Sequence, residues 1–290
     1  MHKILKAINY KVVFFVVLVL VLSIDGVTFY QEFFANDDVL SSSVVASPPT
    51  SPSAANSSSP VAIPTNSPSL APTPSPIPKK SSYKIAVYGD SMVDTMGENL
   101  EYLDNWLNDM YPNVTFKLYN YGIGAENIEM GLARWDWKFD NRDRHFDAIS
   151  KIGADIIVVG SFAYNPFPPH DKNRHWIGLT KLVENAKATG VDVYMLAEIA
   201  PLKAGFGKGP NGINWPEDLA NEQAEHIIEQ LQSAVSLSKE LDVPLINVFE
   251  KSKANGNYGL AVYVNPNDGI HPSVDGHSFM ASLIARSLKL

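Results

Sequence analysis

The chain has 290 residues, no cysteine and a formal net charge of −8. Without cysteine, neither a disulfide framework nor thiol chemistry is possible. Five of the 23 basic and four of the 31 acidic residues lie in residues 1–82, which leaves 18 basic against 27 acidic side chains in residues 83–290. An acidic unit of this kind lacks the positive surface with which proteins bind nucleic acid or anionic lipid, and we expect neither as its partner.

Residues 1–34 combine a basic end with an apolar run. Three lysines precede an unbroken apolar stretch over residues 12–22, and Asp25 ends it. This order is typical of a secretory signal or a signal anchor. The run is shorter than the ~20 residues of a comfortable membrane span, which favours a cleaved signal, but no small-residue cleavage site follows closely. We expect a transmembrane signal anchor with its basic end in the cytoplasm, and a secreted protein if the segment is cleaved.

Residues 35–82 form a low-complexity tract. Ten prolines fall between Pro48 and Pro78, interleaved with Ser, Thr and Ala. Such a composition cannot bury apolar surface and favours extended conformations. We predict a disordered linker that holds the following domain away from the membrane. A glycosylated stalk and a ligand for SH3-type domains are the alternatives.

Residues 83–290 alternate between strand-like and helix-like patterns. The strand-like runs are residues 84–88, 115–120, 155–160, 192–198 and 244–248. The helix-like stretches are residues 97–110, 126–152 (expected to be broken), 172–189, 216–241 and 273–288. Residues 156–159 are apolar on both faces, as in a parallel strand covered by helices on both sides. The alternation predicts one α/β domain, a flavodoxin-like three-layer α/β/α sandwich with a mostly parallel five-stranded sheet.

Four polar or glycine-rich segments follow the predicted strands. Three come directly after a strand, and the fourth comes after the last strand and its long loop: residues 89–92, 120–127, 160–165 and 268–271. In an open parallel sheet, ligands bind outside the carboxyl ends of the strands. We therefore expect all four segments to meet at one edge of the sheet.

Two of these segments carry the groups that acyl transfer needs. The Ser91 hydroxyl lies on the turn after the first strand, and Asp268 and His271 are three residues apart, so that one loop can aim the carboxylate at the imidazole. Together they supply a nucleophile, a base and an orienting group. Singly, the serine would be interpreted as a helix N-cap and Asp268 as a turn residue. Their joint occurrence favours a catalytic triad.

The motifs also resemble the four sequence blocks of the SGNH (GDSL-type) hydrolases. The resemblance covers about residues 83–290 and is carried by Gly89-Asp90-Ser91, Asn120-x-Gly-x-Gly, Asn165 and Asp268-x-x-His271. It implies that Ser91 attacks an ester carbonyl and that His271 accepts its proton and later delivers it to the leaving alcohol. Asp268 would hold the imidazole, and no metal or organic cofactor would be needed.

The resemblance further implies an oxyanion hole. Its donors would be the Ser91 backbone N–H, a backbone N–H of Gly124 or Ala125, and the Asn165 side-chain amide. Two positions depart from the family pattern: Ala125 stands where a second glycine is common, and Phe162 stands where the third block usually has its asparagine. Asn165 comes three residues later, so that a longer loop must bring it to the site or the donor is absent.

Other polar and aromatic residues give weaker indications. Three histidines match no common zinc spacing, and we expect them at the surface: His145, His170 and His175. Trp135 and Trp137 cannot share a helix face, which predicts one in the core and one as a stacking platform for a sugar. The glycine-rich residues 205–215 have the length and position of a lid over the substrate.

These observations predict a serine esterase that hydrolyses esters, above all acetyl esters, on extracellular or cell-surface carbohydrate. Two alternatives remain open. The same triad could transfer an acyl group to a glycan, or the domain could be a non-catalytic glycan-binding module on a degenerate hydrolase fold. The expected partner is a small-molecule or glycan ester, and the expected contact with a membrane is through the N-terminal segment alone.

Overall fold

The structure is a computed structural model, which describes residues 79–254 and 256–290. The predicted signal anchor, and the linker up to residue 78, lie outside the described residues. Within the described part of the chain, no helix has the length and apolarity of a membrane span.

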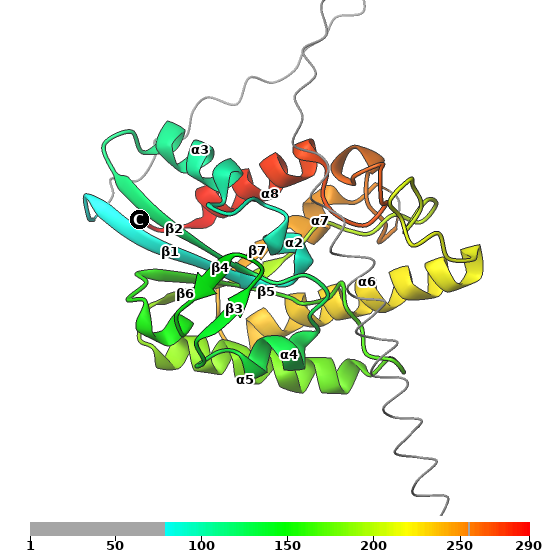
Figure 1. Ribbon diagram of the computed structural model, residues 1–290, viewed down its shortest axis with the longest axis horizontal. Coiled ribbons are helices and arrows are strands. Elements are labelled where there is room, and N and C mark those ends of the chain that lie inside the picture. Colours follow the sequence, from blue (N-terminus) through cyan, green and yellow to red (C-terminus); the bar gives the residue numbers. More distant parts are fainter. Residues whose placement is uncertain (1–78, 255) are drawn as a thin grey trace, which may run out of the picture. The chain divides into compact units, whose positions relative to one another are not determined.

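The folded unit is built on a sheet of five parallel strands (Figure 1). They are β1 (Ser82–Gly89), β2 (Thr115–Gly122), β5 (Ile156–Gly160), β6 (Asp192–Ala197) and β7 (Leu245–Asn247), in the order β2-β1-β5-β6-β7. Every residue of the central β5 is buried, as its two-sided apolar pattern predicts. The five predicted strands and the parallel sheet are therefore confirmed.

The sheet begins slightly before residue 83, where the sequence placed the domain boundary. β1 starts at Ser82, and the Ser81 carbonyl accepts a hydrogen bond from Thr115 N–H (2.9 Å). The Lys80 ammonium pairs with the Asp155 carboxylate at 2.6 Å. These contacts add the last residues before 83 to the folded unit.

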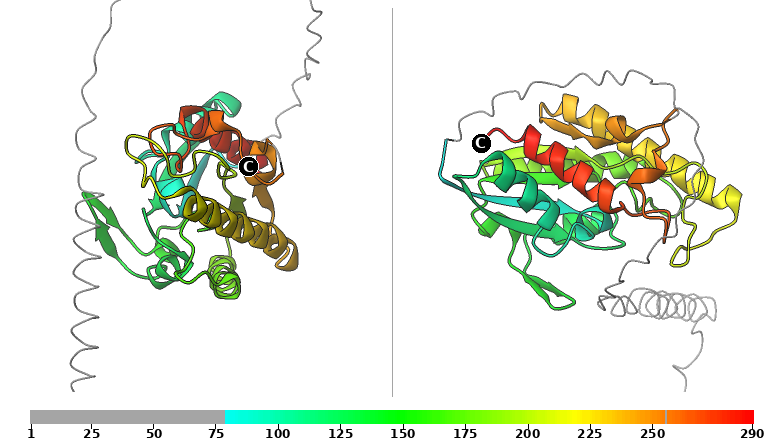
Figure 2. Two further views of the ribbon diagram at one scale, coloured as in Figure 1. Left: turned by 90° about the vertical axis from the view of Figure 1, so that its right-hand side faces the viewer. Right: turned by 90° about the horizontal axis from the view of Figure 1, so that it is seen from above.

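Helices cover both faces of the sheet (Figures 1 and 2). The long ones are α3 (Glu101–Met110), α5 (Lys172–Ala188), α6 (Glu217–Glu240) and α8 (Val274–Ser287). The short ones are α2 (Ser91–Asp94), α4 (Ile128–Ala133) and α7 (Val248–Ser252). Side chains of α3 and α8 share one core with the sheet, side chains of α5 lie in the second core on the opposite face, and α6 contributes to both. The predicted three-layer α/β/α sandwich is confirmed.

The prediction of a broken helix over residues 126–152 is wrong for most of its length. The helix α4 ends at Ala133, and an antiparallel hairpin follows, with β3 (Phe139–Asn141) paired to β4 (Arg144–Phe146). A 3₁₀ turn over Ile149–Lys151 completes the segment. The rings of Phe139 and Phe146 stack across the hairpin with centroids 4.6 Å apart. This cross-strand pair stabilises the hairpin, and a helical periodicity cannot reveal it.

Candidate active site

Ser91 lies at the carboxyl end of β1, as the first residue of α2, and is half-buried. The helix cap is made by the preceding residue: Asp90 Oδ1 accepts the Met92 N–H at 3.0 Å. The usual structural reason for a serine at a helix start is therefore fulfilled by Asp90, and the Ser91 hydroxyl is left out of the cap.

Asp268 and His271 form the predicted pair. His271 Nδ1 lies 3.2 Å from Asp268 Oδ2, and Asp268 Oδ1 accepts the backbone N–H groups of Ile270 (2.7 Å) and His271 (2.9 Å). Burial acts to raise the pKa of Asp268, but the hydrogen bonds and the charge of His271 outweigh it, so that the pKa lies below its usual value. The carboxylate is thus ionised and fixed, and it orients the imidazole with Nε2 on the opposite side of the ring.

The His271 ring and the start of α2 lie at the same edge of the sheet. Burial raises the pKa of Asp90 to about 6, and the charge of His271 is one of the effects that oppose this shift. The imidazole is therefore near enough to the residue that precedes Ser91 for their charges to interact. The described contacts include no hydrogen bond between Ser91 Oγ and His271; such bonds are often long before substrate binds.

Asn165 reaches the same place through an unusual loop. Its Nδ2 donates to Asp90 Oδ2 at 3.2 Å. Phe162, which occupies the usual asparagine position, has a φ of 55° and is fully buried, with its ring 6.0 Å from that of Tyr88. The backbone turn at Phe162 thus sends one side chain into the core and brings Asn165 into contact with Asp90, the residue before Ser91.

The second block packs directly on the helix that carries Ser91. The Asn120 side-chain amide donates to the Val93, Asp94 and Gly97 carbonyls at 3.0, 3.2 and 2.7 Å. Beyond it, Gly124 and Ala125 are half-buried, and Ala125 has a φ of 60°. Alanine therefore adopts the left-handed conformation that the family's glycine takes easily, at some cost in backbone strain.

Gly122 allows this close packing, because a Cβ there would lie 2.1 Å from the Asp94 backbone nitrogen. We expect Gly122→Ala to lower the free energy of unfolding by about 1–3 kcal/mol, since the backbone of α2 must move. The measurement is chemical unfolding followed by circular dichroism. Gly124→Ala is the matched control for stability, since its Cβ would meet Asp94 Oδ2 at an ordinary 3.6 Å. Equal stability of the two variants would contradict the argument.

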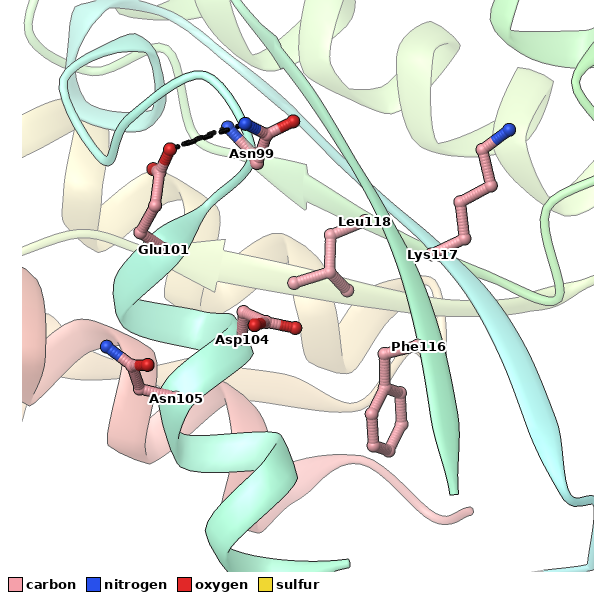
Figure 3. Close-up of a pocket in the computed structure, with 7 residues that line it drawn as sticks. All are labelled: Asn99, Glu101, Asp104, Asn105, Phe116, Lys117 and Leu118. Carbon is pink, nitrogen blue, oxygen red and sulfur yellow. Dashed lines mark hydrogen bonds between the residues drawn. The ribbon is translucent and has the colours of Figure 1, made fainter. Parts of the chain in front are cut away.

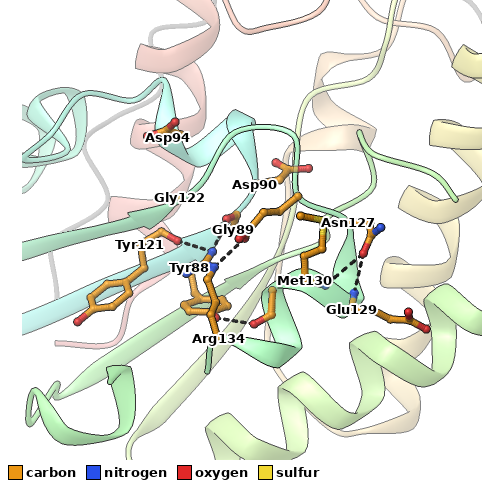
Figure 4. Close-up of polar contacts among 12 residues, drawn as sticks. Tyr88, Gly89, Asp90, Asp94, Tyr121, Gly122, Asn127, Glu129, Met130 and Arg134 are labelled. Atoms are coloured by element: carbon orange, nitrogen blue, oxygen red, sulfur yellow. Dashed lines mark hydrogen bonds and ion pairs between the residues drawn. The ribbon is translucent and has the colours of Figure 1, made fainter. Parts of the chain in front are cut away.

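Sequence reasoning missed Arg134, which ties the ends of two strands together (Figure 4). Its Nη2 donates to the carbonyls of Gly89 (3.0 Å) and Tyr121 (2.9 Å), and its Nε pairs with Glu126 at 2.6 Å. The guanidinium also lies over the Tyr88 ring, 4.1 Å from its centroid. Arg134 thereby holds the turn before Ser91 against the second block. No local pattern identifies it, because its partners lie up to 45 residues away.

A second arginine, Arg144, connects the β3–β4 hairpin to α2, the short helix that begins with Ser91. Arg144 Nη2 lies 2.5 Å from Asp94 Oδ1 and donates to the Gly122 carbonyl at 3.1 Å. The hairpin that replaces the predicted helix is therefore anchored at the edge of the site. Of the two tryptophans near it, Trp135 is buried and Trp137 is 70% exposed, so that they divide between core and surface without sharing a helix.

The glycine-rich residues 205–215 support the Asp268 loop instead of forming a free lid. The backbone N–H groups of Gly207 and Asn211 donate to the carbonyls of Gly269 and Asn267 at 3.1 and 2.8 Å. Gly269 has a φ of 69°, and a Cβ there would lie 2.2 Å from the Gly205 carbonyl oxygen. The segment is therefore packed, backbone to backbone, against the loop that holds Asp268.

The three histidines lie in different environments. The His145 side chain is exposed, as expected, and it pairs with Asp140. His170 is mostly enclosed beside Glu229. The expectation of a surface position is wrong for His175: it is fully buried, its Nε2 donates to the Ser161 carbonyl at 2.8 Å, and burial lowers its pKa to about 4.

A pocket of about 390 Å³ lies elsewhere, between α3 and the edge strand β2 (Figure 3). It is lined by Asn99, Glu101, Asp104, Asn105, Phe116, Lys117 and Leu118. None of the predicted site residues contributes to it. The candidate active site is therefore defined by its polar groups at the strand ends and not by this pocket.

The comparisons with known proteins identify the family of the folded unit. The model of the GDSL-like lipase/acylhydrolase family matches residues 85–284, a range that contains all the predicted site residues. The comparison with curated proteins found no match.

Several solved structures share the fold. A lipase/acylhydrolase from Enterococcus faecalis has 15% identity and a TM-score of 0.52, over 70% of this chain and 94% of its own. A GDSL-like lipase from Bacteroides thetaiotaomicron has 15% identity and a TM-score of 0.51, over 74% and 89%. An acetylxylan esterase from Geobacillus stearothermophilus has 15% identity and a TM-score of 0.50, over 72% and 94%. With the family model matched along most of the folded unit, the chain belongs to the GDSL-like lipase/acylhydrolase family of ester-cleaving enzymes.

Proposed function

We propose that the chain is a serine esterase in which Ser91 is the nucleophile, His271 the general base and acid, and Asp268 the orienting carboxylate. The observation that carries the proposal is the Asp268–His271 pair, whose imidazole charge acts on Asp90, the residue before Ser91. Because Asp268 holds Nδ1, the His271 Nε2 is the nitrogen that is available to take the Ser91 proton.

The reaction has two steps. His271 Nε2 removes the Ser91 Oγ proton as the oxygen bonds to the ester carbonyl carbon, and the ester C–O bond then breaks while His271 returns the proton to the leaving alcohol. Water, deprotonated by the same imidazole, attacks the acyl-serine. The bond between Ser91 Oγ and the acyl carbon then breaks, which releases the acid, and His271 returns the proton to Ser91 Oγ.

The negative charge on the carbonyl oxygen needs donors. Asp90 occupies one Nδ2 hydrogen of Asn165 and so fixes the amide, which leaves the second hydrogen for the oxyanion. The backbone N–H of Ser91 and that of Gly124 or Ala125 complete the set. Asn165, although displaced in sequence, thus takes the role of the missing third-block asparagine.

For the substrate, we infer acetyl esters on carbohydrate outside the cytoplasm. The fold is shared with an acetylxylan esterase, and the sequence before the domain has the composition of an anchor followed by a spacer. We infer that the domain is held outside the cytoplasm by residues 1–34, or is secreted if that segment is cleaved, and that its only membrane contact is through this segment.

The test is the activity of Ser91→Ala toward p-nitrophenyl acetate and toward acetylated xylan. We expect a loss of at least about 10³-fold in kcat and no labelling by a fluorophosphonate probe, because the variant lacks the hydroxyl that forms the acyl-enzyme in this mechanism. Ser236→Ala, at an exposed position on α6, is the control and should keep full activity. Labelling or turnover that persists in Ser91→Ala would refute the assignment.

The ester substrates and the fluorophosphonate probe also distinguish the esterase from its two alternatives, an acyltransferase and a binding module. Acetylated glycan formed from an acetyl donor in preference to free acetate would indicate an acyltransferase. A wild-type chain that binds glycan but neither hydrolyses the ester nor reacts with the probe would indicate a binding module.

A further inference from the structure

Glu198 is a fully buried acid for which the reaction above has no role. It directly follows β6, and its Oε1 accepts the Ser161 N–H at 2.9 Å, while its Oε2 is hydrogen-bonded to the Ser161 hydroxyl. A Cβ added at Gly160 would lie 2.8 Å from Oε1, so the carboxyl group is pressed against the end of β5. A buried carboxyl in such a position must be matched by specific partners, and Ser161 supplies two of them.

Ser161 begins the loop that delivers Asn165. Its hydroxyl accepts the Ala163 N–H at 3.2 Å across Phe162, the residue with positive φ, and its carbonyl accepts His175 Nε2 at 2.8 Å. The N–H, hydroxyl and carbonyl of Ser161 are thus all bonded to buried groups. These bonds fix the turn at which Phe162 enters the core and the chain continues toward Asn165.

The far end of the loop is fixed to the same segment. The Tyr164 hydroxyl donates to the carbonyl of Ile199, the residue after Glu198, at 2.9 Å. Tyr164 directly precedes Asn165, whose Nδ2 donates to Asp90 Oδ2. Residues 198 and 199 therefore fix the 161–165 loop by hydrogen bonds on both sides of the turn at Phe162.

We propose that Glu198 is a positioning residue for ester cleavage: through Ser161 it holds the 161–165 loop in the conformation that presents the Asn165 amide beside Ser91. The inference rests on the proposed function of Ser91 and Asn165. In this role Glu198 does not contact the substrate. The role gives a reason for a buried acid that is bonded to Ser161.

The protonation of Glu198 gives this role a distinctive signature. Burial, and then the Asp90 carboxylate, raise the pKa of Glu198 to about 8. Besides Glu198 and Asp90 themselves, the titratable groups that face these two carboxyl groups are the Tyr164 phenol, the His175 ring, and His271, whose charge acts on Asp90. Near pH 7 Glu198 therefore keeps its proton. Above pH 8 it ionises and adds a second negative charge near the Asp90 carboxylate, which disfavours the negative charge of the oxyanion, so kcat should fall.

The experiment compares wild type, Glu198→Gln, Glu198→Ala and Ser161→Ala, with Glu240→Gln on α6 as an exposed control. The readouts are kcat and KM for p-nitrophenyl acetate between pH 6 and 9.5. Glutamine keeps an acceptor for the Ser161 N–H and a donor for its hydroxyl, so we expect kcat at pH 7 within about threefold of wild type and no decline around pH 8. Glu198→Ala should lose about 10–100-fold in kcat with KM nearly unchanged, because Asn165 is displaced.

A readout without activity separates charge from catalysis. The folded pKa of Glu198 is raised above its ordinary value, so its contribution to stability is complete at low pH and is lost as the pH rises toward 8. Glutamine lacks this loss. We therefore expect Glu198→Gln to raise the thermal midpoint relative to wild type more at pH 8.5 than at pH 5, with no such difference for Glu240→Gln.

The outcomes that overturn the inference are specific. Wild-type kcat in Glu198→Ala, or a loss in Glu198→Gln at pH 7 as large as that in Glu198→Ala, would do so. If Glu198→Ala does not fold, a decline in Glu198→Gln at the same pH as in wild type, or wild-type kcat in Ser161→Ala, would do so as well. A wild-type enzyme with no Ser91-dependent hydrolysis refutes the proposed function instead, so the two failures are distinguishable.

Discussion

His271→Ala is expected to lower kcat for p-nitrophenyl acetate by about 10³-fold or more, with KM changed little, because the acceptor for the Ser91 proton is removed. Asp268→Asn should cost nearly as much while preserving the shape of the loop. Asp268 Oδ2 faces His271 Nδ1 at 3.2 Å, and an amide donor at that position stabilises the tautomer that carries its proton on Nε2. The ring then cannot accept the Ser91 proton.

The control for these variants is His145→Ala, at an exposed histidine on β4 whose partner is Asp140. It should retain wild-type kcat. The rate of fluorophosphonate labelling provides a second measurement, since it depends on activation of Ser91 and not on deacylation. Labelling of His271→Ala at the wild-type rate would show that another group activates the serine and would contradict the assignment.

The architecture could be predicted from the sequence because burial in this fold follows local patterns. The apolar run of β5 is buried at every residue, and the buried side chains of α6 recur at the spacing of one helix face. Ser91, Asp268 and His271 could be proposed as site residues for a related reason. The carboxylate and imidazole share one short loop, and the serine comes soon after a strand. Short segments of the sequence therefore contain most of the information.

What could not be predicted depends on contacts between distant segments. The hairpin over β3 and β4 is stabilised by the Phe139–Phe146 stack and by the bond of Arg144 to Asp94, 50 residues earlier. The Asp94 contact lies outside residues 126–152, and a helical periodicity does not encode the cross-strand Phe139–Phe146 stack, so the helix prediction failed there. Glu198 could not be recognised either, since its partner Ser161 lies 37 residues away on the neighbouring strand end.

The third sequence block, residues 160–165, could be predicted from the sequence only in part. Phe162 in place of the usual asparagine left two possibilities from the sequence, a missing donor or a longer loop. The longer loop is favoured by the positive φ of Phe162 and the bonds of Ser161 to Glu198, because the chain turns there so that Asn165 Nδ2 reaches Asp90. A backbone conformation fixed by a buried carboxyl group is not readable from the composition of the loop itself.

The importance of that loop makes Asn165→Ala the second large-effect variant. It should lower kcat by about 10²–10³-fold, equivalent to ~3–4 kcal/mol of transition-state stabilisation, with KM little changed, since the lost donor acts on the oxyanion and not on the bound ester. Asn105→Ala, at an exposed position on α3, is the matched control and should leave kcat unchanged.

Two further variants test whether position 165, and not position 162, carries the donor. Asn165→Asp places a second carboxylate beside Asp90 Oδ2 and should be at least as inactive as Asn165→Ala, because it removes the donor and adds negative charge. Phe162→Asn in the Asn165→Ala background should not restore activity, since the Phe162 side chain points into the core against Gly131 and Tyr88. Recovery of kcat in that double variant, or an Asn165→Ala enzyme within threefold of wild type, would mean that the oxyanion is held without the Asn165 amide.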